Sequence, residues 1–367
     1  MGQLFSARDH PLRRRPDQLR SQAVSGYASN DVEVAVVIVN YRTASLTVQC
    51  LAALKGEKAL LPRLKAIVVD GGSGDGSAEE LAKAIEHADF CDWVSLLALP
   101  INGGFGWANN QAIMTLAGSA APPEFIHLLN PDTKVERGAV AALVRDLQDH
   151  PNCGAAGSQL LNTDGQLAAS AFPFPTAGHE FVNVSLSERL GGLFGVAARS
   201  LQPGKAMDVD WVTGASVMFR SQALRETGLF DDGFFLYFEE VELMHRMRAK
   251  GWSVRHVPDS RVVHIEGAAT GLGAAAVRPH PAYWYRSRRR YFALTGGRRG
   301  VAASNLAWVG GSMISALKSL AGRSVANPAR LKDLLRVGVI PGKSDLSSSV
   351  PAWSDQPGKP PAWMDTK

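Results

Sequence analysis

The feature that most constrains the fold is a regular alternation between short apolar runs and amphipathic stretches in the first part of the chain. Short apolar runs bounded by polar loops predict buried strands, and the stretches between them have helical periodicity. The predicted strands are Val34–Val39, Ala66–Val69, Trp93–Leu97 and Phe125–Leu129, and the predicted helices are Ser45–Leu54, Ser77–His87 and Trp107–Leu116. This order predicts an α/β fold, with a mostly parallel sheet flanked by helices on both faces.

The alternation loosens after about Pro151. An Asp-Gly pair at 164–165 predicts a hairpin turn, and residues 172–206 are expected to be an irregular, mobile segment over a site. Phe238–Lys250 is predicted to be a helix ended by Gly251, and closing strands are expected at 254–257 and 261–264. 

The predicted organisation has five parts. Residues 1–30 form a disordered basic leader, 31–150 the first half of the α/β domain and 151–270 its second half. Residues 271–325 form an aromatic and basic helical extension, and 326–367 a mostly disordered tail rich in Pro and Ser.

Composition indicates a globular protein, with 46% hydrophobic and 20% charged residues and a net charge of +5. Arginines cluster at 13–15 and at 286–290, so anionic partners are expected. Nucleic acid is not expected among them, because the clusters lie toward the two ends of the sequence and no motif of a nucleic-acid-binding module can be recognised. Three widely spaced cysteines fit a reducing compartment.

Two segments raise the question of membrane contact. Val301–Leu320 is apolar but diluted by Asn305 and Lys318, so we expect it to lie on a membrane surface or pack on the protein. Aromatic and arginine residues interleave in Tyr283–Phe292, which suits the interface of an anionic bilayer. A helix packed on the catalytic domain, with its arginines solvated, explains that stretch equally well. The polar N-terminus is not a secretory signal.

Two acidic motifs point to chemistry. Asn130-Pro-Asp132 follows the fourth predicted strand, and Asp132 could bind a divalent cation, with Asn130 as a weaker oxygen donor. A turn in which Asp132 caps the next helix is the alternative. Glu239 and Glu240 open a predicted helix beside a run of aromatic residues, which would raise a carboxyl pKa and favour a general base. Glu242 and Arg246 have the spacing of an ordinary surface ion pair.

Further polar residues follow the other strands, where ligands of doubly wound sheets bind. Tyr41 could stack on a base and Arg42 could meet phosphate, although a plain turn explains both residues. Asp70 ends the second strand before a glycine-rich loop, and could bind a nucleoside or cap the next helix. Asn102-Gly-Gly-Phe-Gly precedes a helix N-terminus, which is an anion site or a structural loop.

Taken in this order, the motifs from Val34 to His264 resemble the inverting glycosyltransferases of family 2, which have the GT-A fold. The resemblance implies that Tyr41 and Asp70 hold the nucleotide base and that Asp75 supports the ribose. It places the other nucleotide-binding residues at Arg42, Asn102, Gly104, Asn109 and Asn130.

The same resemblance implies a Mg²⁺ or Mn²⁺ ion held by Asp132 and His264, with Asn130 where the family has the first acid of its Asp-x-Asp motif. Glu240 stands at the position of the usual base, and the assignment between Glu240 and Glu239 stays open. The implied acceptor-binding residues are Trp211, Thr213, Gly214 and Tyr237.

The Asn-Pro-Asp form and the Phe-Phe-Leu-Tyr-Phe-Glu-Glu run look most like bacterial rhamnosyltransferases of surface polysaccharide synthesis. This implies a nucleotide-sugar donor such as dTDP-L-rhamnose, and a saccharide or polyprenyl-diphosphate-linked acceptor. It also implies a cytoplasmic enzyme at the inner face of the plasma membrane, with peripheral membrane contact. The expected partners extend to a second copy of the chain in a homo-oligomer, and the sequence leaves its stoichiometry open.

Two rival functions share parts of this pattern. A sugar-1-phosphate nucleotidyltransferase would need a basic glycine-rich loop after the first strand, where Asn40-Tyr-Arg stands. A non-catalytic nucleotide-sugar-binding scaffold would need no acid at Glu240 or Asp132. Both acids are present, which favours an enzyme.

Overall fold

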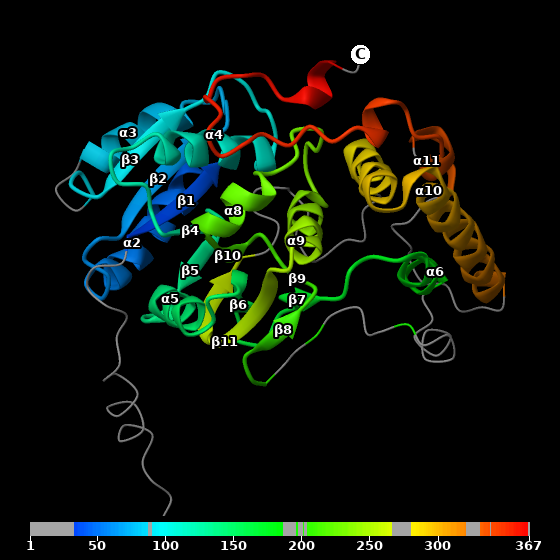
Figure 1. The fold of residues 1–367 in the computed structure, drawn as a ribbon, viewed down its shortest axis with the longest axis horizontal. Coiled ribbons are helices and arrows are strands. Elements are labelled where there is room, and N and C mark those ends of the chain that lie inside the picture. Colours follow the sequence, from blue (N-terminus) through cyan, green and yellow to red (C-terminus); the bar gives the residue numbers. More distant parts are fainter. Residues whose placement is uncertain are drawn as a thin grey trace, which may run out of the picture.

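A mixed β-sheet lies at the centre of the computed structural model, which describes residues 33–86, 90–185, 196, 201, 204–265, 280–320, 331–337 and 339–365. The sheet order is β3-β2-β1-β4-β10-β6-β11-β5, and β8 pairs with β11 (Figure 1). The strands are β1 (Val34–Asn40), β2 (Lys65–Asp70), β3 (Val94–Ala98), β4 (Phe125–Leu129), β5 (Thr133–Val135), β6 (Cys153–Leu161), β8 (Met207–Val209), β10 (Ser216–Arg220) and β11 (Ser253–His264).

The first four strands are parallel, as the sequence predicted, and their carboxyl ends share one edge of the sheet. Strand β10 is antiparallel to both β4 and β6, while β6 and β11 are parallel. The two closing strands predicted at 254–257 and 261–264 form one strand, β11, with a register shift between Val257 and Arg261. A separate two-stranded sheet joins β7 (Ala171–Phe172) and β9 (Trp211–Val212).

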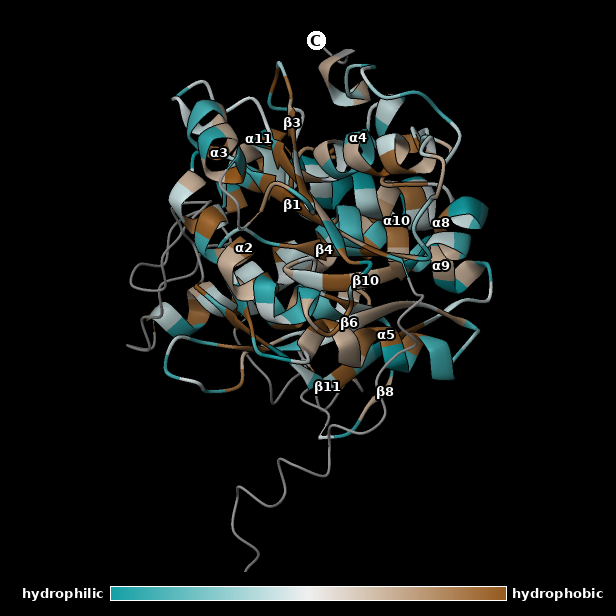
Figure 2. Cartoon of the chain, turned by 90° about the vertical axis from the view of Figure 1, so that its left-hand side faces the viewer, coloured by the Kyte–Doolittle hydropathy of each residue, from teal (hydrophilic) through white to brown (hydrophobic). Residues whose placement is uncertain are grey.

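Helices cover both faces of the sheet, as the layered view in Figure 2 shows. Val36 and Ile38 of β1 belong to a core cluster with Leu51 and Val140, whereas Val37 belongs to a second cluster with Leu243. The strand therefore buries both of its faces, which explains its continuous apolar run. The helices are α2 (Ala44–Lys58), α3 (Ser77–Glu86), α4 (Phe105–Ala117), α5 (Ala139–Asp149), α6 (Ala177–Ser185), α8 (Ser221–Thr227) and α9 (Glu239–Ala249).

Buried polar groups fix the helix starts. The carboxylate of Glu57, which is fully buried at the end of α2, accepts hydrogen bonds from the backbone N–H groups of Gly138, Val140 and Ala141. These N–H groups open α5 and have no partner within the helix. A single acid on one helix thus caps another, and the helix dipole favours its negative charge.

The region 172–206 is only partly irregular. The structure places helix α6 at 177–185, against the C-terminal helix α10 (Ala282–Leu320), and residues 186–195, 197–200 and 202–203 lie outside the described residues. The hairpin predicted around Asp164-Gly165 is reduced to a turn with one β-bridge between Leu161 and Leu167. The leader at 1–30 also lies outside the described residues.

The prediction of a disordered tail is wrong for residues 331–337 and 339–365. These residues form α11 (Leu331–Val337), two short 3₁₀ helices (Ser344–Leu346 and Ala362–Asp365) and a strap along α4. The indole N–H of Trp107 donates to Lys359 O at 2.8 Å, and that of Trp363 donates to Gly103 O at 2.9 Å. Pro- and Ser-rich composition did not reveal these partners, because they lie about 250 residues upstream.

Candidate active site

The ends of β1 and β2 are joined by a polar network. Asn40 and Asp70 pair in register, and Asn40 Nδ2 donates to Asp70 Oδ1 at 2.8 Å. Asp70 also accepts from Ser73, through the backbone N–H at 3.1 Å and the hydroxyl at 2.6 Å. Sequence reasoning found Asp70 but missed Asn40 and Ser73, although both stand in the motifs that it quoted. Asp70 thus folds the following loop back over the sheet edge.

Tyr41 and Arg42 lie on the same edge. Arg42 has a positive φ of 58°, and its backbone N–H donates to Ser73 Oγ at 3.0 Å. Its side-chain Nε donates to Ser73 O at 3.1 Å, and the guanidinium stands 5.2 Å from the centre of the Tyr41 ring. The positive charge and the ring are therefore held together above the carboxyl ends of β1 and β2.

An open pocket of about 430 Å³ lies beside this network. It is lined by Asp70, Gly72, Gly74, Gly76, Ala78, Glu79 and residues 98–100. Asp75 belongs to the same loop, where its Oδ1 accepts from the N–H of Ser77 at 3.1 Å. Hydrogen bonding to Ser77 lowers the Asp75 pKa, so this exposed acid is ionised at the start of α3.

The glycine-rich loop at 102–104 packs against the segment that precedes α9. Asn102 Oδ1 accepts from Gly104 N at 3.1 Å, and Phe105 N donates to Phe235 O at 3.1 Å. Gly104 has φ 93°, and a Cβ there would overlap Phe235 O. Asn109 lies one turn into α4, where its Nδ2 donates to Phe105 O and its buried Oδ1 has no partner among the described residues.

Asp132 and His264 meet after β4 and at the end of β11. Thr133 pairs in register with His264, and Ile265 N donates to Asp132 O at 2.9 Å. His264 Nε2 lies 3.3 Å from Asp132 Oδ1. Asp132 is 4% exposed, and this Oδ1 has no hydrogen-bond partner among the described residues. A buried carboxylate oxygen that accepts no hydrogen bond but has an imidazole nitrogen 3.3 Å away suits a cation that both groups could bind.

Glu239 and Glu240 begin α9 after two residues with unusual backbone geometry. Tyr237 and Phe238 both have φ 70°, which is uncommon for residues with a side chain. Burial and the neighbouring Glu240 raise the pKa of Glu239 well above its ordinary value. Burial also raises the pKa of Glu240, but backbone N–H groups of Glu240, Gly214 and Val241 oppose this by stabilising the carboxylate.

These contacts favour one proton on the pair, held by Glu239, and a negative charge on Glu240. Two adjacent carboxyls in a buried site rarely ionise together. Glu240 lies at the N-terminus of α9, where the helix dipole also favours an anion. Of the two acids, half-buried Glu240 has the better stabilised carboxylate and is better suited to accept a proton.

One short segment connects the two acidic groups. Gly214 lies beside Glu240 and hydrogen-bonds its carboxylate, and the next residue, Ala215, accepts at its O from Asn130 N at 2.9 Å. Asn130 is two residues from Asp132. The structure thus brings the Asn130–Asp132 turn and the Glu239–Glu240 pair to the same end of the sheet.

Two of the proposed acceptor-side residues, Trp211 and Tyr237, stack on different parts of the protein. Trp211 stacks on Phe172 with 4.3 Å between ring centres, and its indole N–H donates to Pro173 O, so its ring is largely engaged by β7. Tyr237 is half-buried and stacks on Tyr283 of α10 at 6.1 Å. Burial raises the Tyr237 pKa to about 12, so its hydroxyl keeps its proton and can donate. 

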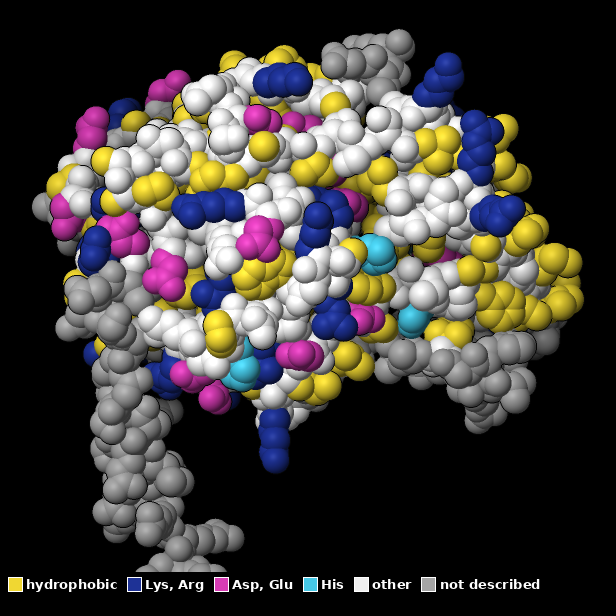
Figure 3. Space-filling view, in the orientation of Figure 1, with side chains coloured by type: hydrophobic (Ala, Val, Ile, Leu, Met, Phe, Trp, Pro, Cys, Tyr) yellow, Lys and Arg dark blue, Asp and Glu magenta, His cyan; other side chains and the backbone are white. Residues whose placement is uncertain are grey.

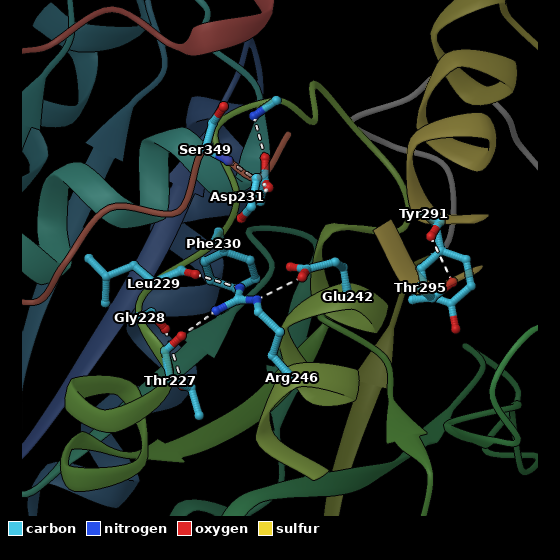
Figure 4. Close-up of polar contacts among 12 residues, drawn as sticks. Thr227, Gly228, Leu229, Phe230, Asp231, Glu242, Arg246, Tyr291, Thr295 and Ser349 are labelled. Atoms are coloured by element: carbon cyan, nitrogen blue, oxygen red, sulfur yellow. Dashed lines mark hydrogen bonds and ion pairs between the residues drawn. The ribbon is translucent and has the colours of Figure 1, made fainter. Parts of the chain in front are cut away.

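The Glu242–Arg246 pair is not the surface pair that its spacing predicted. Glu242 is 4% exposed, and Arg246 donates to Glu242 Oε1 at 2.7 Å. The other guanidinium nitrogens donate to Thr227 O at 2.6 Å and Leu229 O at 2.7 Å, as Figure 4 shows. Arg246 therefore fixes α9 against the segment after α8, and the position of Glu239 and Glu240 depends on this clamp.

The arginines of Tyr283–Phe292 also differ from the prediction of bilayer contact. Arg288 is fully buried and pairs with Glu180 of α6, while Arg290 pairs with buried Asp231 at 2.7 Å. Arg289 pairs with Asp345 at 3.0 Å. The helix is packed on the catalytic domain, as the alternative expected, but Arg288 and Arg290 are buried in ion pairs and are not solvated as that alternative had them.

Comparison with known proteins agrees with this geometry. The model of "Glycosyl transferase family 2" matches residues 35–170, and that of "Glycosyl transferase family group 2" matches residues 125–321, which is more than half of the chain. An N-acetylglucosaminyl-diphospho-decaprenol L-rhamnosyltransferase of Mycobacterium tuberculosis is 28% identical over 250 residues, covering 66% of this chain and 78% of the relative. A low-salt glycan biosynthesis hexosyltransferase of Haloferax volcanii is 22% identical, covering 60% of this chain and 64% of the relative.

Solved structures show the same fold. A mannosyltransferase from Pyrobaculum calidifontis, in complex with GDP-Man and Mn²⁺, has a TM-score of 0.50 and 16% identity, covering 87% of this chain and 84% of that chain. GalNAc-T7 with UDP, GalNAc and Mn²⁺ has a TM-score of 0.50 and 16% identity, covering 73% of this chain and 49% of that chain. The GT-A-like fold expected from the sequence is thereby confirmed. The chain belongs to glycosyl transferase family 2 and is a glycosyltransferase that resembles bacterial rhamnosyltransferases.

Proposed function

We propose that this enzyme transfers a sugar, with inversion, from a nucleoside diphosphate donor to an acceptor carried on a lipid diphosphate. The observation that carries the proposal is the contact chain from Glu240 through Gly214 and Ala215 to Asn130, two residues before Asp132. It supports a single site in which one acid serves the acceptor and the other serves the departing diphosphate.

The donor nucleotide would bind along the carboxyl edge of β1 and β2. The pocket beside Asp70 has room for a base and ribose, with Tyr41 available for stacking and Asp75 at the loop. Arg42 adds positive charge at the same edge. The glycine-rich loop with Asn102 and Gly104, followed by Asn109 in the first turns of α4, lies between this edge and α9, so the diphosphate would pass across it toward Asn130 and Asp132. 

A divalent cation, Mg²⁺ or Mn²⁺, fits Asp132 and His264. Asp132 offers a buried oxygen that lacks a donor, and His264 Nε2 lies 3.3 Å from it. The described residues contain no group of three or more acidic, His or Cys side chains suited to a metal, so further ligands would come from the substrate diphosphate and water. When bound there, the cation would neutralise charge on the leaving diphosphate.

Glu240 would act as the base. Its carboxylate accepts the proton of an acceptor hydroxyl, and the hydroxyl oxygen forms a bond to the anomeric carbon. The bond from that carbon to the diphosphate oxygen breaks, and the electron pair leaves with the nucleoside diphosphate. Attack from the face opposite the leaving group inverts the anomeric configuration. Tyr237, Thr213 and Gly214 would line the acceptor side, with Trp211 behind them.

Donor and acceptor are proposed from the likeness to the M. tuberculosis rhamnosyltransferase, whose name specifies L-rhamnose and a decaprenol diphosphate. They are dTDP-L-rhamnose and a polyprenyl-diphosphate-linked saccharide. Such an acceptor would place the enzyme at the cytoplasmic face of the plasma membrane in surface polysaccharide synthesis.

A donor screen tests the proposal. The full-length protein is incubated with each of several nucleotide sugars and a lipid-linked N-acetylglucosamine acceptor, with Mg²⁺, Mn²⁺ or EDTA, and the release of nucleoside diphosphate is measured. We expect transfer from dTDP-rhamnose that EDTA abolishes and Mn²⁺ or Mg²⁺ restores. Transfer from another donor would reject rhamnose, and undiminished transfer in EDTA would reject the metal assignment.

A further inference from the structure

The second half of α10 is apolar on two opposite sides. Its backbone departs from helical geometry at Gly297, and the helix continues from there to Leu320. One side of this second half packs inward through the buried residues Val301, Ser304, Trp308 and Gly311. The other side exposes large apolar side chains, which are Leu306 (74% exposed), Met313 (63%), Leu317 (61%) and Leu320 (86%).

Helix geometry separates these two sets cleanly. At about 100° per residue, the four exposed side chains fall within an arc of roughly 60°, opposite the buried set. Figure 3 shows hydrophobic side chains gathered at the right-hand edge of the molecule, where α10 runs in Figure 1. A helix that buries one apolar side and exposes another has a second surface to bury.

The exposed stripe continues onto the neighbouring segment. Asn305 Nδ2 donates to Val339 O at 3.0 Å, which holds residues 339 and 340 beside α10. Leu334 of α11 is buried with Tyr285 and Trp308, whereas the next residue, Leu335, is 60% exposed. Val339 (39%) and Ile340 (79%) add to the surface. We call the exposed residues of α10 and α11, together with 339 and 340, the apolar face.

Positive charge accompanies this face. Residues 281–345 contain twelve Lys and Arg and two Asp, a surplus of ten, while the whole chain carries +5. The remainder of the protein is therefore net negative by five. Buried ion pairs use Arg288, Arg289 and Arg290, but other cations are exposed on the same helices and the segment after them, namely Arg298, Arg299, Lys332, Arg336 and Lys343.

We propose that the apolar face docks the enzyme on an anionic lipid bilayer, lying in the interface without crossing it. By length and composition α10 could span a membrane. Its first half, however, is held inside the protein by the Arg288 and Arg290 ion pairs, and its second half packs against α6, where Gly311 lies on Phe181. An amphipathic surface with apolar side chains among cations is typical of interfacial binding.

The charge favours a bilayer over a second copy of the chain. A symmetric dimer through this face would bring two identical cationic surfaces together, since an isologous interface pairs each patch with itself. An anionic membrane instead neutralises them. The choice also rests on the proposed function, because an acceptor on a lipid diphosphate lies in the same membrane.

The helix that carries the apolar face also contacts the acceptor side, through its first half before the break at Gly297. Tyr283, at the start of α10, stacks on Tyr237, three residues before Glu240, and Ser287 Oγ donates to Leu236 O at 2.9 Å. Docking of α10 would therefore fix the direction from which a lipid-linked acceptor reaches Glu240. The device is positional, so it changes access to the base and leaves the base itself unaltered.

Vesicle flotation tests the proposal with the full-length protein. The vesicles are phosphatidylcholine with or without phosphatidylglycerol. The variants are Leu317→Glu, Arg298→Ala and Arg299→Ala, each made singly. Leu317→Glu should lower the partition coefficient on anionic vesicles about tenfold, because an apolar anchor is replaced by an anion. Each arginine change should lower the partition coefficient about fivefold, on anionic vesicles only. Added salt should weaken the binding of the wild-type protein to these vesicles.

Leu167→Glu is the matched control, since Leu167 is 56% exposed after β6 and lies outside the apolar face. It should float like the wild type. Equal flotation of Leu317→Glu and the wild type, or no flotation of the wild type, overturns the proposal. A lipid-free dimer in sedimentation that Leu317→Glu converts to monomer also overturns it and identifies a second copy as the partner.

The outcome is separable from that of the proposed function. Flotation needs no catalysis, so it stands whatever the donor screen shows. If transfer is found, Leu317→Glu should lose activity on a bilayer-embedded acceptor and keep it on a water-soluble, short-chain acceptor. Equal loss on both acceptors would show damage to the catalytic site, and it would overturn a role for the apolar face in acceptor access.

Discussion

Glu239→Gln and Glu240→Gln, made separately, should have very different effects on catalysis. The two carboxyls are adjacent at the start of α9, but their surroundings differ. Glu239 is 2% exposed and its side chain faces Gly106 of α4, where burial favours the protonated form. Glu240 receives backbone N–H groups, including that of Gly214, which favour the carboxylate. Gln is the size of Glu and has no ionisable proton.

The structure sets the expected magnitudes. Glu240→Gln removes the acid whose carboxylate is better stabilised by backbone N–H groups, and loss of a positioned base typically lowers kcat by about 10²–10⁴, or about 3–5 kcal/mol in the barrier. Glu239→Gln replaces a protonated acid by a neutral amide, so we expect a loss of less than about tenfold. Neither change should remove contacts of the Asp70 pocket, so the affinity for the donor nucleotide should be nearly unchanged.

The pH dependence follows from the same contacts. The base must be ionised, and the pKa of Glu240 is raised by burial, so kcat/KM should rise as the pH increases through that raised value. Glu239→Gln should keep this rise, since Glu239 carries no charge in the active form. Glu240→Gln should flatten it.

The assay is steady-state transfer with the donor found in the screen, together with nucleotide binding by calorimetry and thermal unfolding of each variant. The reasoning is refuted if Glu240→Gln turns over near the wild-type rate. It is equally refuted if Glu239→Gln is the inactive variant while Glu240→Gln retains the pH-dependent rise, because the base would then be Glu239. Loss of nucleotide binding in either variant would show disruption of the fold at α9.

Three further changes test the surrounding structure. Asp232→Asn should stabilise the protein above pH 7 by up to about 4 kcal/mol and have little effect below pH 4. Burial raises the Asp232 pKa from 3.8 to about 7, so the native wild-type protein loses stability as the pH rises between these values. Urea unfolding at several pH values checks this. Gly104→Ala should cost about 3 kcal/mol in a thermal melt, since φ is 93° and a Cβ would overlap Phe235 O; an unchanged melt contradicts the contact. Trp363→Ala should cost about 1–2 kcal/mol, because it removes the indole hydrogen bond to Gly103 O and the packing on Phe235 that hold the glycine-rich loop. Amide exchange across the loop, including Gly104 N–H, should speed up; unchanged exchange would show that the strap is dispensable.

Local sequence patterns predicted the sheet edge well. The strands that end in Asn40 and Asp70 were legible because both of their faces are buried, so their residues form continuous apolar runs. The positions of Asp132 and Glu240 at one end of the sheet followed from the family resemblance. Their common link through Gly214 and Ala215 could not be derived, since hydrogen bonds between distant segments leave no periodic signal.

Long-range ion pairs explain the main errors. Arg288 and Glu180 are 108 residues apart, and Arg290 and Asp231 are 59 apart. Without these partners the arginines looked like a cationic surface, although each is almost fully buried. Glu242 was misplaced for a similar reason, because its i,i+4 partner also binds two backbone carbonyls of another segment. Charge patterns show which residues need a partner, and only the fold supplies that partner.

The strained turn before α9 shows why the C-terminal extension is part of the catalytic unit. Positive φ at both Tyr237 and Phe238 costs on the order of 1–3 kcal/mol each, and such geometry persists only where neighbours impose it. The neighbours come from three elements: Phe105 N of α4 donates to Phe235 O, Ser287 Oγ of α10 donates to Leu236 O, and Glu242 N of α9 donates to Phe238 O. An α/β domain without α10 would keep the donor edge at Asp70 and lose one of the three restraints that aim Glu240. The first half of α10 therefore helps to place Glu240, ahead of the break at Gly297 that separates it from the apolar face.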